Sequence, residues 1–361
     1  MATTLKGALE LVTQSTRDLP DRLVFIADIA ANHDGDLDRA LSLIELAAEA
    51  GADIAKFQHF RAETIVSATG FAELGENASH QKSWRESVFE TYRKYALPYE
   101  WTETLAARCA HAGIEFMSTP YDFKAVDLLA PLVQSFKIGS GDLNWHEFLG
   151  YVAELGKPMI LATGASTWDE VASAVSVVQE HGAPLTVMQC NTNYTGDEGN
   201  DAFLNLRVLS EYRRRFPGCA IGLSDHTKGS ATIQLAVALG ATVFERHFTD
   251  DSTRPGPDHA FSLEPAEWRA MVDAALAAQR SLGSGVKVVE ENEISARVVQ
   301  RRAIRYASHL KPGTRLERKD LRVTRPCPNG AMDASQVEAI LGSVLAVAVE
   351  EDSLADRSHF R

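Results

Sequence analysis

The most constraining feature of this chain is a repeated transition, in which a helix-like segment ends in glycine and a short apolar run follows at once. A glycine in this position can adopt the left-handed backbone conformation without a Cβ clash, so it ends the helix and turns the chain. The transition occurs at Ala50-Gly51-Ala52, Ala112-Gly113-Ile114, Leu155-Gly156-Lys157, His181-Gly182-Ala183 and Leu239-Gly240-Ala241.

The apolar runs are continuous rather than alternating, which is typical of parallel strands that are covered on both faces. Together with the amphipathic segments between them they extend over about 260 residues, the usual size of a (β/α)8 or TIM barrel. An open doubly wound sheet is the alternative, but no G-x-G-x-x-G sequence follows the first run. The expected strands are Phe25–Ile29, Ile54–Phe57, Ile114–Met117, Phe136–Ile138, Met159–Ala162, Leu185–Met188, Ala220–Leu223 and Val243–Phe244, and the expected helices include Leu37–Ala50, Trp168–Glu180 and Leu204–Arg215.

Two departures from this rhythm indicate the organisation of the chain. About forty residues, Arg61 to Glu100, separate the second strand from its helix, and insertions of this length are often functional lids or interface arms. Near Gly283 the pattern changes to a charged helical stretch and then to short strands. We therefore expect an N-terminal extension (1–20), a barrel (21–283), a linker (284–299) and a small domain (300–361).

The charge balance limits the classes of partner. With 36 Lys and Arg against 49 Asp and Glu, the formal net charge is −13. This argues against nucleic acid or an anionic membrane as partner, although a few focused cations can still bind a small anion. The sequence shows no signal-peptide core and no membrane-length apolar run, so we expect a cytoplasmic protein.

Two lysines, Lys56 and Lys137, lie inside strands that are otherwise apolar. A buried lysine is costly unless it is paired, so one explanation is an internal ion pair with Asp28 or Asp142. Because active sites of TIM barrels form at the C-terminal ends of the strands, two such lysines also favour an anion site there. A Schiff-base lysine, as in an aldolase, is the competing use.

His226 and His247 close two consecutive strands, so they should be neighbours at the rim of the barrel. Neutral imidazoles at that separation can share a divalent cation, with water and substrate oxygens as further ligands. The residue types leave the metal open among Mn, Co, Fe, Zn and Mg.

Taken in order, the strand-end residues resemble the sialic acid synthase (N-acetylneuraminate synthase) family over nearly the whole chain. Each segment alone is a weak signal, but their joint order and spacing are specific. The segments are Asn32-His33-Asp34-Gly35-Asp36, Lys56-Phe57-Gln58, Ser118-Thr119-Pro120, Lys137-Ile138-Gly139-Ser140-Gly141, Thr163-Gly164, Ser224-Asp225-His226-Thr227, Glu245-Arg246-His247-Phe248-Thr249 and Pro255-Gly256-Pro257-Asp258-His259.

The resemblance implies a TIM barrel followed by a small, mainly-β antifreeze-like (SAF) domain, paired as a domain-swapped homodimer. It implies a transferase that condenses phosphoenolpyruvate and water with an N-acyl hexosamine aldehyde, N-acetylmannosamine or a modified relative. The products would be a sialic-acid-like nonulosonate and phosphate. A divalent metal, Mn²⁺ before Mg²⁺ or Co²⁺, would polarise the aldehyde.

The same resemblance assigns roles to individual residues. Asp28, Asp142, Lys56 and Lys137 would be catalytic, and His226 and His247 would hold the metal. Phosphoenolpyruvate would be bound by Lys56, Thr119, Lys137, Ser140, Thr192 and Ser224. The acceptor sugar would be bound by Gln58, Tyr194, Asp258 and, from the partner's small domain, Arg325.

The sequence also departs from the family pattern. Asp28 and Asp142 stand where the family usually has Glu, Ala162 replaces a serine, and the loop after Arg325 is one residue longer. Our hypothesis is therefore that the acceptor is a modified or differently configured sugar rather than plain N-acetylmannosamine. The alternatives are a divergent barrel aldolase or isomerase, and a non-catalytic sugar-binding homologue.

Overall fold

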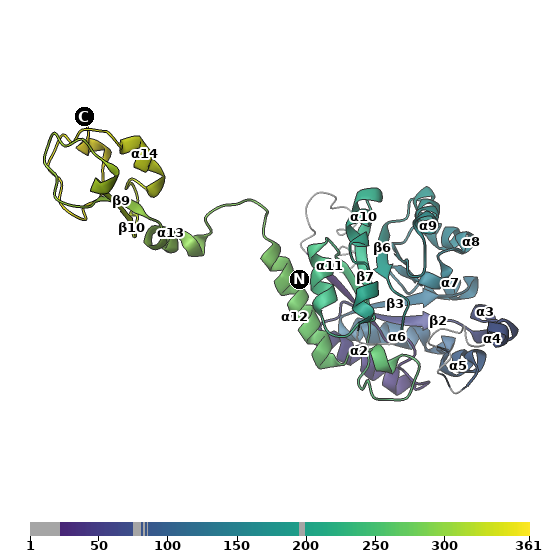
Figure 1. Cartoon of the computed structure of the whole chain (residues 1–361). Helices are drawn as coiled ribbons and strands as arrows, with labels where there is room; N and C mark the ends of the chain where they lie inside the picture. Colours follow the sequence, from purple (N-terminus) through teal and green to yellow (C-terminus); the bar gives the residue numbers. More distant parts are fainter. Residues whose placement is uncertain (1–21, 75–80, 82–83, 85, 195–198) are drawn as a thin grey trace. The chain divides into compact units, whose positions relative to one another are not determined.

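The computed structural model describes residues 22–74, 81, 84, 86–194 and 199–361 (Figure 1). Contacts within the chain divide it into two compact units, one that ends at Gly283 and one that begins at Ser284. The expected N-terminal extension, residues 1–20, lies outside the described residues.

The first unit is a closed barrel of eight parallel strands in sequential order, in which β1 pairs with both β2 and β8. Helices surround the strands (Figure 1), so the predicted TIM barrel is confirmed. The strands are β1 (Val24–Asp28), β2 (Ile54–His59), β3 (Glu115–Pro120), β4 (Phe136–Ile138), β5 (Met159–Ala162), β6 (Leu185–Cys190), β7 (Ala220–Ser224) and β8 (Val243–His247).

Several strands continue beyond the apolar runs that predicted them. β8 was expected to end at Phe244 but extends to His247, and β2 extends to His59. Backbone pairing with a neighbouring strand does not depend on side-chain polarity, because N–H and C=O groups form the ladder. The polar residues at the strand ends therefore belong to the sheet itself, which fixes their direction.

One barrel helix follows each strand, after the insertion in the case of β2, and glycine ends several of these helices as predicted. The five expected glycines, at positions 51, 113, 156, 182 and 240, all have positive φ angles. The capping box of Thr167 with Glu170 is also present. The barrel helices are α2 (Leu37–Ala50), α6 (Thr102–Ala112), α7 (Phe123–Leu129), α8 (His146–Ala153), α9 (Trp168–Glu180), α10 (Val208–Arg215), α11 (Ala231–Ala238) and α12 (Pro265–Leu282).

The bounds of α2 and α9 are those predicted, but α10 begins at Val208 rather than Leu204. Asn205 has a φ angle of 48°, in the left-handed region, and this conformation interrupts a right-handed helix before it can start. The short 3-10 helix η5 (Asn200–Phe203) precedes this break.

Alternation along the strands divides the barrel interior into two zones. Side chains two apart on a strand share a face, so Val24, Ile26 and Asp28 of β1 all point inward. The lower interior is filled by a buried apolar cluster that includes Ile26, Met117 and Met188. Charged residues occupy the same inward-facing rows closer to the C-terminal ends of the strands, for example Asp28 and Lys56.

The insertion after β2 contains α3 (Ala62–Ile65), α4 (Ala68–Leu74), α5 (Val88–Tyr95) and the 3-10 helix η3 (Tyr99–Trp101). Hydrogen bonds join both ends of this region to the barrel, two of them buried and one exposed. The imidazole of His59 lies 2.7 Å from the Ser118 hydroxyl and 2.8 Å from the Thr102 hydroxyl. The Thr64 hydroxyl donates to Asp122 at 3.0 Å. The insertion is thus held over the ends of β2 and β3.

The second unit contains a two-stranded antiparallel sheet of β9 (Ala303–Tyr306) and β10 (Leu321–Thr324) with its own buried core. Isolated β-bridges, such as Leu310 with Val349, extend the strand pairing. A short helix, α14 (Val337–Ile340), completes it. The segment expected as a linker contains the 3-10 helix η7 (Glu291–Glu293) and most of α13 (Ile294–Gln300).

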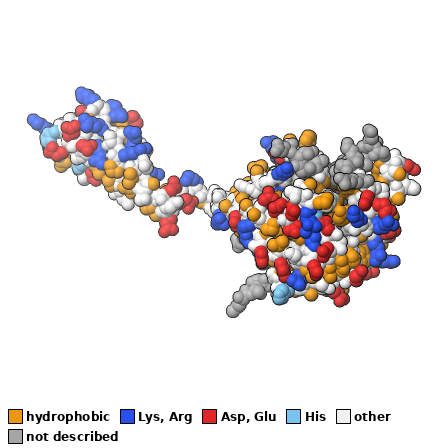
Figure 2. All heavy atoms as spheres, turned by 90° about the horizontal axis from the view of Figure 1, so that it is seen from below, with side chains coloured by type: hydrophobic (Ala, Val, Ile, Leu, Met, Phe, Trp, Pro, Cys, Tyr) orange, Lys and Arg blue, Asp and Glu red, His pale blue; other side chains and the backbone are white. Residues whose placement is uncertain are grey.

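The surface carries charges of both signs. On the face drawn in Figure 2, acidic and basic side chains of the described residues are interspersed rather than gathered by sign. None of the helices in the described part of the chain combines the length and the apolar character that crossing a bilayer requires.

Glu115, at the start of β3, provides a test of the barrel interior. It is 7% exposed, accepts a hydrogen bond from Ser135, and burial raises the pKa of its carboxyl from 4.5 to about 7. The native state thus holds this proton more tightly than the unfolded chain, so the free energy of unfolding should fall as the pH rises through this range. Glu115→Gln should remove this dependence on pH. Between pH 5 and pH 8, the free energy of unfolding of the variant should therefore rise by about 2 kcal/mol relative to that of the wild type. Urea denaturation at several pH values measures the difference, and a gap that does not change with pH would contradict the prediction.

Candidate active site

A cavity of about 210 Å³ opens at the C-terminal ends of the barrel strands. Its floor is formed by the inward-facing polar residues, and most of the residues predicted for the site line it. Those that do are Asp28, Lys56, Gln58, Thr119, Lys137, Ser140, Tyr194, Ser224, His226, His247 and Asp258. The sequence therefore identified the location and most of the floor of this cavity.

Both predicted lysines lie on this floor, and both are paired. The Lys56 ammonium is 2.7 Å from Asp28 Oδ2, and the Lys137 ammonium is 2.9 Å from Glu245 Oε1. All four side chains are almost completely buried. Each lysine is thus part of an ion pair, as one interpretation of the sequence proposed, and both also line one cavity. The two observations are compatible, because a paired lysine can still face a ligand.

The partner of Lys137 differs from the one expected. Asp142 lies on the 3-10 turn η4 (Ser140–Asp142) beyond the end of β4, whereas Glu245 points inward from β8. Burial would raise the pKa of Glu245, but Lys137 and Lys56 outweigh it and lower that pKa to about 2. Burial likewise opposes the charge on Lys56, yet Asp28 and Glu245 raise its pKa above the ordinary value. Glu245 is thus ionised and Lys56 protonated at neutral pH.

The sequence analysis assigned no role to Glu245. A signal was present, because Glu245 lies two residues before His247 on the same strand and so shares its inward face. One of its carboxylate oxygens, Oε2, is buried without a hydrogen-bond partner among the described residues. This oxygen is available to a ligand or to water.

Hydroxyl groups surround the lysines. Thr119 lies 3.4 Å from the Lys56 ammonium, and Ser224 donates to Glu245 at 3.2 Å. Ser140 accepts a hydrogen bond of 2.9 Å from the Gly164 N–H, which leaves its own proton for another acceptor. The floor thus combines two ammonium groups with several neutral donors, which is a suitable lining for a small anion.

The two predicted metal ligands are neighbours. The rings of His226 and His247 have centroids 5.4 Å apart. Burial, with the other histidine adding to it, lowers the pKa of His226 to about 3. Burial and the charge of Lys56 lower that of His247 to about 3. Both imidazoles are therefore neutral at pH 7 and each keeps a lone pair.

A buried ion pair lies on the opposite face of the same two strands. Asp225 and Arg246, each adjacent in sequence to one of the histidines, approach to 3.7 Å and are almost fully buried. Asp225 also accepts hydrogen bonds from Thr227 and Thr232. Because residues alternate across a strand, this pair ties β7 to β8 directly behind the two imidazoles.

The donor set fits a divalent cation held by two protein ligands. His226 Nδ1 lies 3.1 Å from the Asn191 carbonyl oxygen, so it carries the proton and Nε2 keeps its lone pair. His247 Nδ1 is buried without a hydrogen-bond partner among the described residues. No group of three or more His, Cys, Asp or Glu side chains in the described ranges is placed to hold a metal. Water or substrate oxygens would have to supply the remaining ligands.

Three further predicted residues lie close to the histidines and Asp28. The Tyr194 ring packs edge-on against His226 with centroids 4.3 Å apart, and Gln58 donates to Asp28 at 3.3 Å. Asp258 accepts a hydrogen bond of 3.1 Å from the Ala31 N–H. Burial raises the pKa of Asp258 to about 7. At neutral pH its carboxyl can both donate and accept hydrogen bonds.

An aromatic rim, formed by Phe60, Trp84, Tyr92 and Tyr121, lines the outer part of the cavity. Phe60 contacts Tyr92 and Tyr121 with ring centroids 5.2 Å and 6.0 Å apart, and Trp84 lies 6.1 Å from Tyr92. Trp84 and Tyr92 come from the insertion that the sequence indicated as a lid or an interface arm. Aromatic spacing there gave no periodic signal, so the sequence did not predict this rim.

Three predicted site residues do not line the cavity. Asp142 lies just outside it, where burial raises the pKa of its carboxyl to about 6. Thr192 is not among the lining residues, and its methyl group lies close to Gly164. Arg325 is an exposed residue of the second unit, so the barrel by itself does not contain it. Ala162, which replaces the serine of the family pattern, does line the floor.

Comparison with known proteins supports the family that the sequence resembles. The family model described as "NeuB family" matches residues 43–287, and the SAF domain model matches residues 301–361. The N,N'-diacetyllegionaminic acid synthase of Campylobacter jejuni is 33% identical over 337 residues, which cover 92% of this chain and 98% of that protein. The N-acetylneuraminate-9-phosphate synthase of Homo sapiens is 34% identical over 328 residues, which cover 91% of this chain and 89% of that protein.

A solved structure of a sialic acid synthetase also matches this chain. The N-acetylneuraminic acid (sialic acid) synthetase from Leptospira borgpetersenii, crystallised in complex with citrate, superposes with a TM-score of 0.66 at 29% sequence identity. The match covers 76% of this chain and 90% of that chain. With a family model that spans more than half of its length and relatives aligned over nearly all of it, the chain belongs to the NeuB family and carries a SAF domain.

Proposed function

We propose that the protein condenses phosphoenolpyruvate with the open-chain aldehyde of an N-acyl hexosamine to form a nonulosonate. C3 of the enol phosphate attacks the aldehyde carbon, water adds at C2, and phosphate leaves with cleavage of its C–O bond. As a NeuB family member with relatives named as synthases, the chain is an enzyme of the carbon–carbon bond-forming kind. The observation that carries the proposal is the meeting of two buried lysines and two neutral histidines at one barrel mouth.

The lysine side of the floor suits phosphoenolpyruvate. Lys56 and Lys137 offset the charge of its phosphate and carboxylate, and Thr119, Ser140 and Ser224 supply neutral hydrogen bonds. The carboxylates of Asp28 and Glu245 already compensate the lysines, so the resting cavity is not strongly positive. Binding of a polyanion therefore depends on the donors being arranged before it arrives.

The histidine side suits the acceptor aldehyde. His226 and His247 would hold a divalent cation such as Mn²⁺, Mg²⁺ or Co²⁺. When bound, this cation would act as a Lewis acid on the aldehyde oxygen. Gln58, Tyr194 and Asp258 would bind the hydroxyl and acylamino groups of the sugar. Asp258 suits this role because its carboxyl can donate as well as accept.

Asp28 is our candidate for acid–base work, because it lines the cavity beside Lys56 and His247. Asp142, predicted as catalytic, lies outside the lining of the cavity. It still acts on a lining residue, because the burial of Tyr121 and the charge of Asp142 together raise the pKa of the Tyr121 hydroxyl. The domain-swapped homodimer and the contribution of Arg325 from the partner's SAF domain stay predictions from family resemblance. So does the contact of Thr192 with phosphoenolpyruvate.

The aromatic rim supports our hypothesis of a modified acceptor. Ring faces and edges bind apolar groups better than hydroxyls, and burial of one methyl group is worth about 1 kcal/mol. We therefore propose that the distal end of the sugar carries an apolar substituent, such as a deoxy carbon or a second acetamido methyl group.

The reaction is tested by phosphate release from phosphoenolpyruvate with Mn²⁺ over a panel of N-acyl hexosamines. We expect release that requires both a sugar and the metal, stops with a chelator, and returns when Mn²⁺ is restored. His226→Asn should lose activity and bind Mn²⁺ more weakly in calorimetry. Absence of release across the panel from metal-loaded enzyme would favour the non-catalytic sugar-binding alternative.

The lysines separate the proposal from a Schiff-base aldolase. Lys56 has a raised pKa and pairs with Asp28, so it is protonated and is a poor nucleophile. We expect borohydride to trap no pyruvate adduct on the enzyme, as measured by intact-protein mass spectrometry. A mass increase that disappears in Lys56→Met or Lys137→Met would overturn the proposal in favour of an aldolase.

The pairing of Lys137 makes a stability prediction. Lys137→Met leaves Glu245 buried without its partner, so the free energy of unfolding should fall by about 3–5 kcal/mol. The double variant Lys137→Met, Glu245→Gln should recover most of this stability but none of the activity. Denaturation curves and phosphate release measured on the same preparations distinguish these two effects. Full activity in the double variant would show that Lys137 does not bind substrate.

Acceptor preference tests the aromatic rim. The wild type should have a higher kcat/KM for deoxy and diacetamido sugars than for N-acetylmannosamine. Tyr92→Ala should reduce that preference by about 10-fold, since one apolar contact is worth roughly 1–3 kcal/mol of discrimination. Phe89→Ala, on the same helix but outside the cavity lining, is the matched control and should leave the preference nearly unchanged. A wild type that prefers plain N-acetylmannosamine would refute the hypothesis of a modified acceptor.

A further inference from the structure

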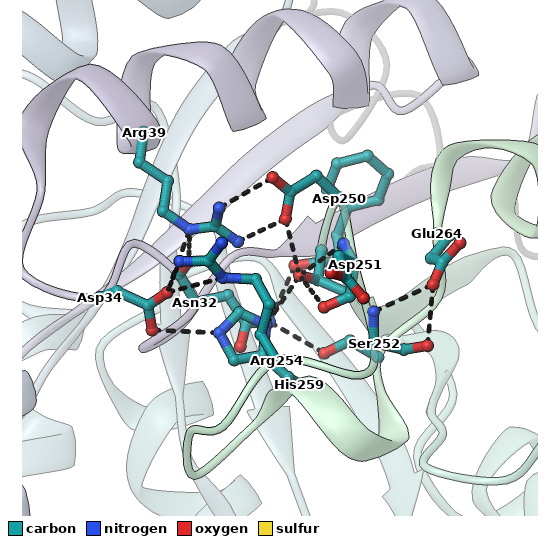
Figure 3. A network of polar contacts seen from close by, with 12 residues as sticks. Asn32, Asp34, Arg39, Asp250, Asp251, Ser252, Arg254, His259 and Glu264 are labelled. Atoms are coloured by element: carbon teal, nitrogen blue, oxygen red, sulfur yellow. Dashed lines mark hydrogen bonds and ion pairs between the residues drawn. The ribbon is translucent and has the colours of Figure 1, made fainter.

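The loops that follow β1 and β8 are joined by a compact set of ionic hydrogen bonds, which we call the loop network: Asp34, Arg39, Asp250, Arg254 and His259 (Figure 3). Asp34 is its centre. Its carboxylate accepts from Arg254 at 2.9 Å and 3.1 Å and lies 3.0 Å from His259 Nε2 and 3.3 Å from Arg39 Nε. Arg39 completes the link by a paired interaction with Asp250.

His259 is fixed at both ring nitrogens. It is fully buried, and because a carboxylate only accepts, its Nε2–H donates to Asp34. Its Nδ1 lies 2.8 Å from the Thr249 hydroxyl. The two partners, which lie on different loops, therefore define the orientation of the ring.

The loop network directly flanks Asp258, the residue proposed to bind the acceptor sugar. His259 is the next residue in the chain, and Arg254 lies four residues before Asp258. On the other side, Ser262 donates to the Asp258 carbonyl oxygen at 2.7 Å. The same hydroxyl accepts from the Asn32 amide at 2.9 Å. The Asp258 carboxylate itself accepts from the Ala31 N–H, so both loops contribute to its position.

The backbone around these contacts adopts conformations that need support. Asp34 has a φ angle of 54°, in the left-handed region that non-glycine residues adopt at a cost. A Cβ atom on Gly256 would lie only 2.6 Å from the His259 ring, so the chain must pass close beside it. These features persist only where the surroundings hold them in place.

A purely stabilising role explains this arrangement less well. Ion pairs that water reaches contribute little to folding, and the Arg254 side chain is 41% exposed. The partners nevertheless converge on one carboxylate beside one binding residue. We propose that Asp34, His259 and Arg254 are positioning residues that hold Asp258 in register with the cavity floor and thereby set affinity for the acceptor sugar. This inference rests on the proposed role of Asp258 in acceptor binding.

The main test is a double-mutant cycle in steady-state kinetics with Asp34→Asn and Asp258→Asn in the full-length, metal-loaded enzyme. Asp34→Asn should raise KM for the acceptor by about 10-fold, because a displacement near 1 Å is enough for such losses, and should leave KM for phosphoenolpyruvate nearly unchanged. In the Asp258→Asn background, Asp34→Asn should add almost nothing, since it acts through the residue already removed.

Two further variants keep the test decisive. Arg254→Gln removes only the exposed partner of Asp34 and should show a smaller rise in the same KM, which guards against misfolding of Asp34→Asn. Asp53→Asn breaks a comparable ion pair with Arg22, 2.6 Å long, beside the N-terminal end of β2. This control should leave both KM values unchanged. Equal increases in both KM values, or full additivity with Asp258→Asn, would overturn the proposal.

Amide hydrogen exchange separates this inference from the proposed function. In the free enzyme, residues 254–262 should exchange faster in Asp34→Asn than in the wild type or in Asp53→Asn. Unchanged exchange in Asp34→Asn would refute the positioning role whatever reaction the enzyme catalyses. Faster exchange in a protein that releases no phosphate would sustain the network as a loop-ordering device and would refute only the proposed function.

Discussion

The structure depends above all on two ion pairs inside the barrel, Lys56 with Asp28 and Lys137 with Glu245. An isolated charge in that interior would cost several kcal/mol, so each lysine needs a partner on another strand. Asp28 and Lys56 face each other on the neighbouring strands β1 and β2, whereas the pair of Lys137 with Glu245 joins β4 to β8 across the interior and so depends on barrel closure. The closed barrel thus has a floor that is charged but electrically balanced.

The same alternation of side chains that directs these charges inward also supports the two histidines. While His226 and His247 face the cavity, Asp225 and Arg246 form a buried pair on the outer face of the same strands. The outer pair and the strand ladder limit how far the imidazoles can move apart. The proposed metal site, with only two protein ligands, would gain from such rigidity, since water or substrate would supply the remaining ligands.

The region to which we assign acceptor specificity comes from other elements than the floor. The strands supply charged and hydroxyl groups with fixed directions, whereas the aromatic rim comes from residues just beyond β2 and β3 and from the insertion that follows β2. Asp258 lies on the loop that Asp34 contacts through Arg254 and His259. Loops placed by a rigid scaffold can change their acceptor without disturbing the floor, which is consistent with family relatives named for different nonulosonates.

Patterns among residues that are neighbours in the sequence predicted the fold. Continuous apolar runs, glycine at helix ends and capping residues are properties of neighbouring residues, so eight strands, helix α2 and helix α9 could be predicted, together with the polar residues that close each strand. Only the tertiary structure decided which of those residues meet. Glu245 rather than Asp142 pairs with Lys137, Thr192 turns towards Gly164, and the insertion provides the aromatic rim, because these contacts join segments far apart in sequence. Their distances follow from barrel closure and loop packing, and neither leaves a periodic signal in the sequence.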